Sequence, residues 1–476
     1  MTSDIPAETL NKILSCIFDE AGKIDLVSLA GFVQTEFQPV TFNGVMYVYN
    51  EDTHLYEQDT GSVNQWVGNV LENASYAGLF STKTPVLSIK KEIYRRVFDA
   101  GVIPGRISPF NKYPGVPVAN GVIIFDEAGK VKLIDYTPEM LFTRQLPIDF
   151  DPNADHRPML KVLSEWAGED VLTLYQIPAQ SIVQSLPDFE PFKRAYLLTG
   201  QGNSGKSSYL ALLQKMFGEM NISGVALQDL AGRFNGSRLF GKFLNVRDDL
   251  QSLTLDSSEN FKEYTGSRKH EVEMKYQHPF VADIHAVHIF SCNKPPEIGE
   301  KLDFDDGFWN RWTVVKFQNN FAVRPGWMRE TFTKENLQGF FKQVVEIAGL
   351  IISDGGLLYE PDPSQVKTMW KEDSSPLLEF LDLYTERGPA SYMIPKDELL
   401  TGLFRWIDDT AESEGEKQDL LSRSPRSKRD LTQRLFREGI DEARVGKKNA
   451  VESYRGVRWK RGCCYAPSLT ENGVLV

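Results

Sequence analysis

The segment AYLLTGQGNSGKSSYLALL, residues 195–213, constrains this chain more than any other. It contains the complete spacing G-x-x-x-x-G-K-S between an apolar strand pattern at Tyr196–Leu198 and an amphipathic helix pattern at Ser207–Phe217. Glycines let backbone N–H groups turn toward phosphate oxygens, and the helix N-terminus adds the positive end of its dipole. The sequence therefore predicts a strand–loop–helix unit of an α/β fold that binds a nucleoside triphosphate.

The residue types inside this loop predict which groups bind the nucleotide. The Lys206 ammonium group would reach the β- and γ-phosphates, and the Ser207 hydroxyl would ligate Mg²⁺. We therefore expect ATP and Mg²⁺ as cofactors. The predicted cofactor-binding residues are the loop and the start of its helix: Gly200, Gln201, Gly202, Asn203, Ser204, Gly205, Lys206, Ser207 and Ser208.

Two later strand patterns end in polar residues that would complete the site. The segment KFLNVRDD, residues 242–249, ends in Asp248 and Asp249. Beside the loop, Asp248 would hold Mg²⁺ and Asp249 would polarise the attacking water. The segment AVHIFSCN, residues 286–293, ends in Asn293, whose amide can orient that water and sense the γ-phosphate.

The chain has 476 residues, which is too long for one hydrophobic core. Proline-containing boundaries at Asp149–Pro158 and Glu360–Pro363 predict three domains, residues 1–152, 153–360 and 361–476. The first is expected to be an α+β domain with a collar or docking role. The second holds the nucleotide motifs, and the third is helical and then strand-like and basic.

Other features bound the cellular setting. The longest apolar stretch, around Val344–Ile352, is short and interrupted by Glu346, which excludes a membrane-spanning helix there. The acidic start shows no secretion signal, and the four cysteines lack paired spacing and fit a reducing compartment. We expect a cytoplasmic protein without a membrane partner.

At these motifs the chain resembles the superfamily 3 helicases, specifically the replicative primase-helicases of phages, plasmids and poxviruses, which belong to the AAA+ class. Besides the P-loop and the strand ending in Asp248, the resemblance is carried by the block 261–276 and by IFSCNKPP followed by DGFWNRWTVVKF, residues 289–296 and 306–317. Upstream, residues 120–125 and 143–154 look like the domain that precedes the motor in that family. The resemblance covers nearly the whole chain, although no primase element is evident.

The resemblance implies roles at matching positions. Arg311 looks like an arginine finger that enters the neighbouring subunit's nucleotide site, and Asn293 looks like sensor 1. The block 265–276 looks like a hairpin in the central channel of a ring, on which Lys275 would grip DNA with Arg268, Lys269 and His270 nearby. On the residues alone, the alternating Glu-Val-Glu pattern also suits an exposed hairpin with an ordinary surface lysine.

Two positions depart from the family pattern. Asp249 stands where the family usually has Glu, so the carboxylate is one methylene shorter. Asn310 precedes Arg311 where the family commonly has two successive arginines, which leaves one finger candidate.

The formal net charge of −12 repels nucleic acid on average, so DNA binding requires a local basic cluster. Residues 423–461 hold thirteen Lys and Arg against five Asp and Glu. Helix patterns at Leu377–Thr385, Lys396–Thr410 and Ser427–Gly439 followed by a basic strand pair have the order of a winged helix, whose third helix can enter a major groove. The alternative is that the basic residues of this region form an ordinary solvent-exposed charged surface without binding DNA. The predicted DNA contacts of this region are Lys428, Arg429, Arg434, Lys448 and Arg458.

We expect an ATP-dependent replicative DNA helicase that forms a ring, which we expect to be a hexamer. It would belong to a virus or mobile element and act in the cytoplasm of the host cell. By resemblance it moves 3′-to-5′ on single-stranded and forked DNA, and a separate primase or polymerase is a candidate partner. One alternative is a nucleotide-switched DNA-binding initiator or scaffold, and another is a double-stranded DNA translocase. Multiple-turnover ATP hydrolysis, measured with and without single-stranded DNA, distinguishes the helicase from the nucleotide-switched initiator. A strand-displacement assay distinguishes the helicase from the double-stranded DNA translocase.

Overall fold

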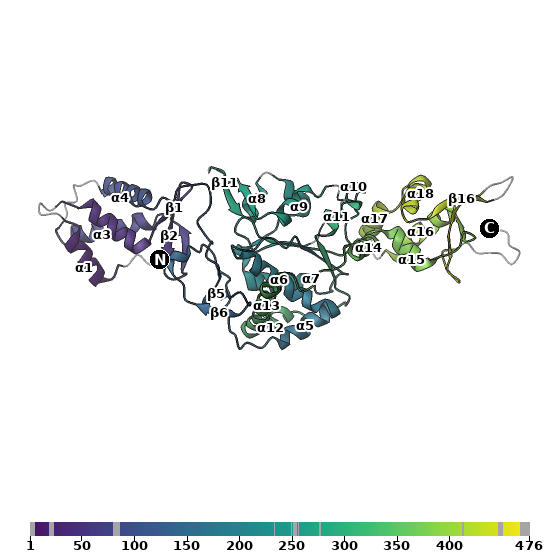
Figure 1. The fold of residues 1–476 in the computed structure, drawn as a ribbon, viewed down its shortest axis with the longest axis horizontal. Helices are drawn as coiled ribbons and strands as arrows, with labels where there is room; N and C mark the ends of the chain where they lie inside the picture. Colours follow the sequence, from purple (N-terminus) through teal and green to yellow (C-terminus); the bar gives the residue numbers. More distant parts are fainter. Residues whose placement is uncertain are drawn as a thin grey trace.

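The chain forms three bodies that lie in a row along its longest axis in a computed structural model (Figure 1). The structure describes residues 5–18, 23–79, 86–232, 234–248, 250, 255, 257–275, 278–411, 414–445 and 451–466. The central body carries the P-loop, and the N- and C-terminal regions extend from its two sides.

A five-stranded parallel sheet forms the centre of the middle body. Its order is β13 (Trp312–Lys316), β7 (Ala195–Thr199), β12 (Val287–Cys292), β9 (Leu244–Arg247) and β8 (Ile222–Ser223). The pairing sets Trp312 opposite Ala195 and Ile289 opposite Tyr196. The carboxyl ends of all five strands therefore lie at one edge of the sheet.

Both faces of this sheet are covered, because alternate residues of its strands enter different cores. Tyr196 and Leu198 pack into one core with α5 (Arg157–Ala167), α6 (Val171–Ser185), α7 (Lys206–Phe217) and α13 (Lys334–Asp354). Ala195 and Leu197 pack into the other core, which includes residues of α8 (Asn235–Leu239), α9 (Glu259–Gly266) and α11 (Asp306–Trp309). This arrangement confirms the prediction of an α/β fold with a parallel sheet flanked by helices.

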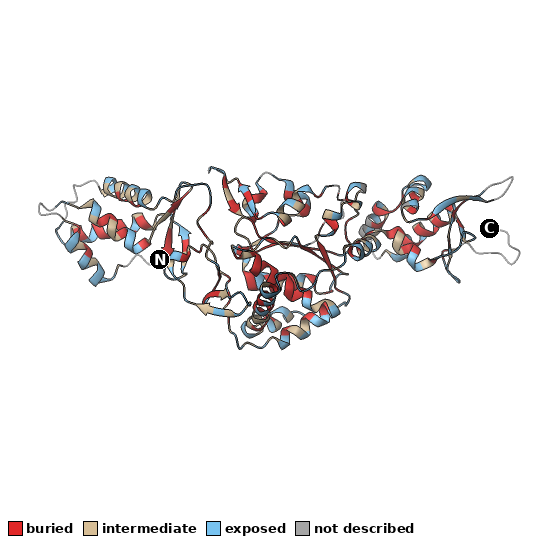
Figure 2. Cartoon of the chain, in the orientation of Figure 1, coloured by how far each residue is buried: buried red, intermediate tan, exposed pale blue. Residues whose placement is uncertain are grey.

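The apolar stretch noted in the sequence lies in α13, the longest helix. Phe340, Val344 and Ile351 are buried in the core that α13 shares with α5 and α6, whereas Leu350 is 51% exposed on the outer side. Figure 2 shows the same one-sided burial in several helices around the sheet. Among the described residues, no helix combines the length and the apolar character needed to cross a membrane.

The N-terminal body has a core of its own. Helices α1 (Ala7–Cys16), α2 (Leu26–Phe37), α3 (Ser62–Tyr76) and α4 (Val86–Ala100) pack beside an antiparallel sheet of β1 (Val40–Phe42), β2 (Val45–Asn50) and β3 (Leu55–Gln58). Its core runs from Ile13 to Val97. The next sheet, β4 (Val116–Val118), β5 (Gly121–Phe125) and β6 (Val131–Ile134), already packs Val116 and Ile123 into the central core. The predicted boundary at residue 152 therefore does not coincide with the limit of a core.

The C-terminal body begins later than residue 361. Helix α14 (Pro363–Ser374) packs Val366 and Trp370 into the central core, and a separate core starts at Leu377. That core joins α15 (Pro376–Tyr384), α16 (Lys396–Thr410), α17 (Glu414–Arg423) and α18 (Lys428–Arg437). Two antiparallel sheets complete the body: β15 (Met393–Pro395), β17 (Val451–Arg455) and β16 (Asp441–Val445) in that order, and β14 (Thr385–Arg387) with β18 (Val457–Trp459).

Candidate functional site

The P-loop joins the end of β7 to the start of α7 and has left-handed backbone at several positions. The φ angles are 148° at Gly200, 59° at Asn203 and 104° at Gly205. A Cβ atom at Gly200 would lie 2.3 Å from the Phe317 carbonyl oxygen, and one at Gly205 would lie 2.6 Å from the Trp166 ring. Both glycines are therefore required by backbone angle and by space.

The Lys206 side chain lies under this loop and is only 6% exposed. Its ammonium group donates to the carbonyl oxygens of Gly200 and Gln201 at 2.5 and 2.9 Å, to Ser204 Oγ at 3.3 Å and to Asn293 Oδ1 at 3.2 Å. Each of these acceptors is an uncharged oxygen, and a phosphate oxygen would form a stronger, charge-assisted bond with Lys206 than any of them. The geometry brings Lys206 and Asn293 together, as the sequence predicted.

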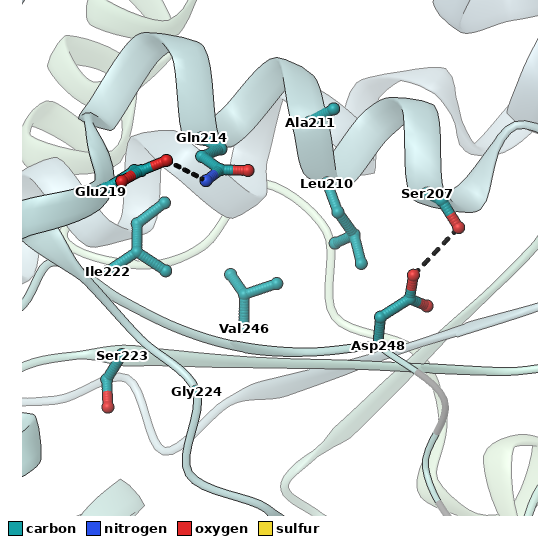
Figure 3. A pocket seen from close by; sticks show the side chains of 10 residues that line it. All are labelled: Ser207, Leu210, Ala211, Gln214, Glu219, Ile222, Ser223, Gly224, Val246 and Asp248. Carbon is teal, nitrogen blue, oxygen red and sulfur yellow. Dashed lines mark hydrogen bonds between the residues drawn. The ribbon is translucent and has the colours of Figure 1, made fainter.

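Asp248 follows the end of β9 beside the P-loop. The Ser207 hydroxyl donates to Asp248 Oδ2 at 2.9 Å, which Figure 3 shows as a dashed line, and the Ser291 hydroxyl donates to Asp248 Oδ1. A hydroxyl and a carboxylate at this spacing are oxygen donors of the kind that Mg²⁺ prefers, so the donor set fits that ion. Asp249 lies outside the described residues.

A cavity of about 430 Å³ extends from this serine–aspartate pair along α7. Figure 3 shows its lining between α7 and the edge of the sheet: Leu210, Ala211, Gln214, Glu219, Ile222, Ser223, Gly224 and Val246. Sequence reasoning missed it because the short strand β8, which forms one wall, has no distinctive pattern.

Arg311 lies at the opposite edge of the sheet from the P-loop. It directly precedes β13, and its carbonyl oxygen accepts from the Ala195 amide at the start of β7. At a strand rise of about 3.3 Å per residue, roughly 20 Å separates this edge from Gly200. The Arg311 guanidinium donates to Thr265 Oγ1 at 2.9 Å and to the Gly307 carbonyl oxygen. The structure therefore does not bring Arg311 to its own P-loop.

The predicted hairpin consists of β10 (Lys269–Val272) and β11 (Phe280–Asp283), so its second arm lies beyond the predicted block. Since β12 begins at Val287, the hairpin lies at the same edge of the sheet as Arg311. Lys269 and Lys275 are exposed.

Two other predicted hairpin contacts are buried. Arg268 is 7% exposed and donates to the carbonyl oxygens of Gln184 and Phe189 at 2.9 and 2.6 Å. His270 is 6% exposed and stacks on the Tyr264 ring, with 4.9 Å between the ring centroids. In this conformation the Arg268 and His270 side chains pack at the base of the hairpin. They do not face solvent, so they are not available to DNA.

The residues of the C-terminal body that were predicted to contact DNA differ in their exposure and in their protein partners. Arg429 is exposed on α18, and Lys428 pairs with Asp397. Arg458 lies over the Tyr392 ring, 3.9 Å from its centroid, and pairs with Glu386. Lys448 lies outside the described residues.

Arg434 faces the central body instead of solvent. Its guanidinium lies 3.1 Å from Glu297, which follows Asn293 by four residues, and donates to the Arg423 carbonyl oxygen at 2.7 Å. Burial raises the pKa of Glu297, and Arg434 opposes that shift. The outer face of α18 instead carries Arg429, Gln433 and the 69% exposed Phe436, spaced four and three residues apart, and the exposed Arg426 precedes the helix. Sequence reasoning missed the last three residues.

His288 makes stability depend on pH. Burial lowers its pKa to about 4, below the ordinary value of 6.5 that it regains on unfolding. The unfolded chain then binds the proton more tightly, so His288 removes up to about 3 kcal/mol of stability as pH falls from about 6.5 to about 4. His288→Gln should flatten this part of the curve in denaturant titrations at several pH values, and the exposed His278→Gln is its matched control. An equally steep acid loss in His288→Gln would contradict the assignment.

The fold and the loop define an α/β protein with P-loop geometry, and comparisons with known proteins add little beyond that. Residues 198–311, from the P-loop strand to Arg311, match the model of a family of unknown function, DUF5906. No curated protein matches the chain. Two solved apo A-form structures of the NrS-1 C-terminal region are similar at 12% identity, with TM-scores of 0.43 and 0.42. Each comparison covers 91% of this chain and 100% of the matched chain.

Proposed function

We propose that this chain is a Mg²⁺-dependent ATPase of the AAA+ class that works as a ring-forming DNA helicase. The observation that carries the proposal is the placement of the P-loop and Arg311 at opposite edges of one sheet. Because about 20 Å of strand separates the backbone at Arg311 from the P-loop, Arg311 would serve as a finger only in the site of another copy. Rings arise when such a head-to-tail contact closes.

The strand order supports the AAA+ assignment. Numbered along the chain from the P-loop strand, the sheet reads 5-1-4-3-2, and its parallel strands flanked by helices are the core expected of that class by resemblance. It sets β12, with Asn293 at its end, between the P-loop strand and β9, with Asp248 at its end. The three loops that would surround the triphosphate thus meet at one edge.

In the proposed reaction, Lys206 exchanges its loop oxygens for the β- and γ-phosphates of ATP. Ser207 and Asp248 would hold Mg²⁺, which would supply positive charge beside the same phosphates. Asn293, already bonded to Lys206, orients the attacking water, and Asp249 polarises it. Arg311 of the adjoining copy stabilises the charge that develops on the γ-phosphoryl oxygens.

The hairpin would link hydrolysis to DNA movement. Arg311 is bonded to Thr265 near the end of α9, and the hairpin begins at Lys269, so a shift of the finger reaches the hairpin through one helix end. The exposed Lys275 and Lys269 are the hairpin cations available to a DNA backbone. Direction of travel, 3′-to-5′, and a viral or mobile-element setting follow only from the resemblance.

The C-terminal body supports a winged-helix assignment. Helix α18 directly precedes the β16–β17 pair, which is the order of helix and strand pair expected of a winged helix. The outer face of α18 offers Arg429 and Gln433, which can bond to guanine and adenine edges in a major groove.

Steady-state ATP hydrolysis measured across protein concentration, with and without single-stranded DNA, tests the proposal. Turnover should rise steeply with concentration as rings form, and forked DNA should be unwound. A protein that hydrolyses ATP fully as a monomer would refute the shared site. Slow hydrolysis indifferent to DNA would instead favour a nucleotide-switched initiator, and translocation without strand displacement would favour a double-stranded DNA motor.

Lys275→Ala should leave basal ATPase activity within about twofold of wild type and lower the unwinding rate about tenfold or more. The substitution removes a contact to the DNA phosphate backbone and leaves the nucleotide site unchanged. Fluorescence-based unwinding of forked DNA measures the effect. Lys130→Ala, an exposed lysine between β5 and β6, is the control. Normal unwinding by Lys275→Ala would remove the hairpin from the proposal.

Arg429→Ala should weaken duplex binding and reduce the slope of log affinity against log salt by about one, since one phosphate or base contact is lost. Arg434→Ala on the same helix should leave that slope unchanged, because its guanidinium faces Glu297. Fluorescence anisotropy at several salt concentrations compares the two. Equal effects would mean that α18 binds DNA through another face.

A further inference from the structure

The hairpin does not stand alone in this fold, because a segment of the N-terminal region runs beside its second arm. The Val281 amide of β11 donates to the Arg106 carbonyl oxygen at 2.8 Å, and Ile107 pairs with Val281 as a parallel bridge. Figure 1 shows β11 on the side of the central body that faces β1 and β2. The hairpin therefore gains a third, strand-like neighbour from residues 106–107.

Charged contacts hold the base of the same arm. Lys112 Nζ lies 2.5 Å from Asp283 Oδ2, and Arg268 Nε lies 3.3 Å from that oxygen. Asp283 is thus shared by a lysine of the N-terminal region and by the buried arginine at the start of the hairpin.

Apolar and polar contacts continue toward the tip. Phe42 at the end of β1 packs edge-on against Phe280 of β11, with 5.8 Å between the ring centroids. Phe42 and Phe110 belong to the same core as Phe280 and Val272, so the core spans both arms and the N-terminal sheet. The Asn43 side chain donates to the His278 carbonyl oxygen at 2.9 Å, close to the exposed Lys275.

We propose that strands β1–β3 and residues 106–112 are a positioning body for the hairpin, so that the hairpin and these segments move as one unit. The physical reason is that an isolated two-stranded hairpin is marginally stable in water and could not transmit force unaided. The third edge, the shared core and the Lys112–Asp283 pair supply the missing support. Lys112 and Asn43 act through the hairpin as positioning residues. This inference rests on the proposed function, because it assumes that the hairpin carries DNA.

The first test loosens the support. Lys112→Ala should lower unwinding about tenfold through hairpin misplacement and leave basal ATPase unchanged. Amide exchange in peptides covering 269–283 should become about tenfold faster because local opening costs less. Lys112→Arg should restore both, and Lys132→Ala on exposed β6 is the control. Wild-type exchange and unwinding in Lys112→Ala would overturn the inference.

The second test asks whether the two parts move together. Asn43→Cys with His278→Cys, in a chain whose exposed Cys16 and Cys464 and half-buried Cys463 are serine, is joined with a short bis-maleimide. Unwinding within about twofold of the unjoined protein is expected, since joining restricts no required motion. Loss of unwinding on joining would overturn the inference.

The two proposals fail separately. If Lys275→Ala unwinds forked DNA normally, the hairpin's role in the proposed function fails. If Lys275→Ala does not unwind but Lys112→Ala does, with unchanged exchange, only the positioning body fails.

Discussion

Replacing Lys206 with alanine is expected to lower ATP turnover by about 10²–10³-fold or more, because the variant loses the one cation placed inside the P-loop to offset phosphate charge. In the present conformation its ammonium group is held by four oxygens of the loop and of Asn293, so it is already positioned for the exchange. Phosphate release under saturating Mg²⁺-ATP measures the effect. Folding is checked by thermal unfolding of the same preparations.

Lys215→Ala is the matched control for this variant. Lys215 lies on the same helix, in its last turn, and is exposed, so its removal changes helix charge without touching the loop. It should hydrolyse ATP at the wild-type rate. Residual turnover of Lys206→Ala near that rate would mean that the loop does not bind the triphosphate as proposed.

Arg311→Ala should bind nucleotide normally and lose about 10³-fold in turnover, the scale associated with removal of an arginine finger. Because its guanidinium lies at the end of the sheet opposite the P-loop, its loss is expected to affect a neighbouring site and to spare its own. Mixing Arg311→Ala with Lys206→Ala subunits should therefore restore part of the activity. Nucleotide affinity is measured with a fluorescent ATP analogue, and turnover is measured across mixing ratios.

Arg329→Ala controls for the loss of an arginine, because Arg329 is exposed on α12 (Trp327–Thr331). Arg311 also bonds to Thr265 and Gly307, so thermal unfolding must show that the variant is folded. If no mixing ratio recovers activity while both variants assemble, the shared site is refuted. Full activity of Arg311→Ala alone would refute the finger itself.

Local signals made much of the fold predictable. The helix expected at Lys396–Thr410 has those bounds in α16, and the strand and helix around the P-loop differ from β7 and α7 by one residue at most. These elements were predictable because the periodicity of apolar residues and the positions of glycines are properties of a short stretch of sequence. Helix α17 was missed, since its sequence is strongly charged and lacks a clear apolar stripe.

The exposure of the charged residues was less predictable. Arg268 is buried because carbonyl oxygens of Gln184 and Phe189, far away in sequence, converge on it. Arg434 faces inward because Glu297 lies on a loop of another body. Spacing along one helix or strand says which residues share a face, but it does not say which distant segment covers that face.

By itself, the sequence determined the glycine-rich loop, its flanking strand and helix, and the α/β class, because glycine backbone angles and apolar periodicity are local properties. Only the tertiary structure decided that Arg311 and the hairpin lie across the sheet from the P-loop, that the N-terminal region contacts the hairpin, and that Arg434 meets the central body. Those contacts depend on how separate cores pack and on strand order, and neither is encoded in any short stretch of residues.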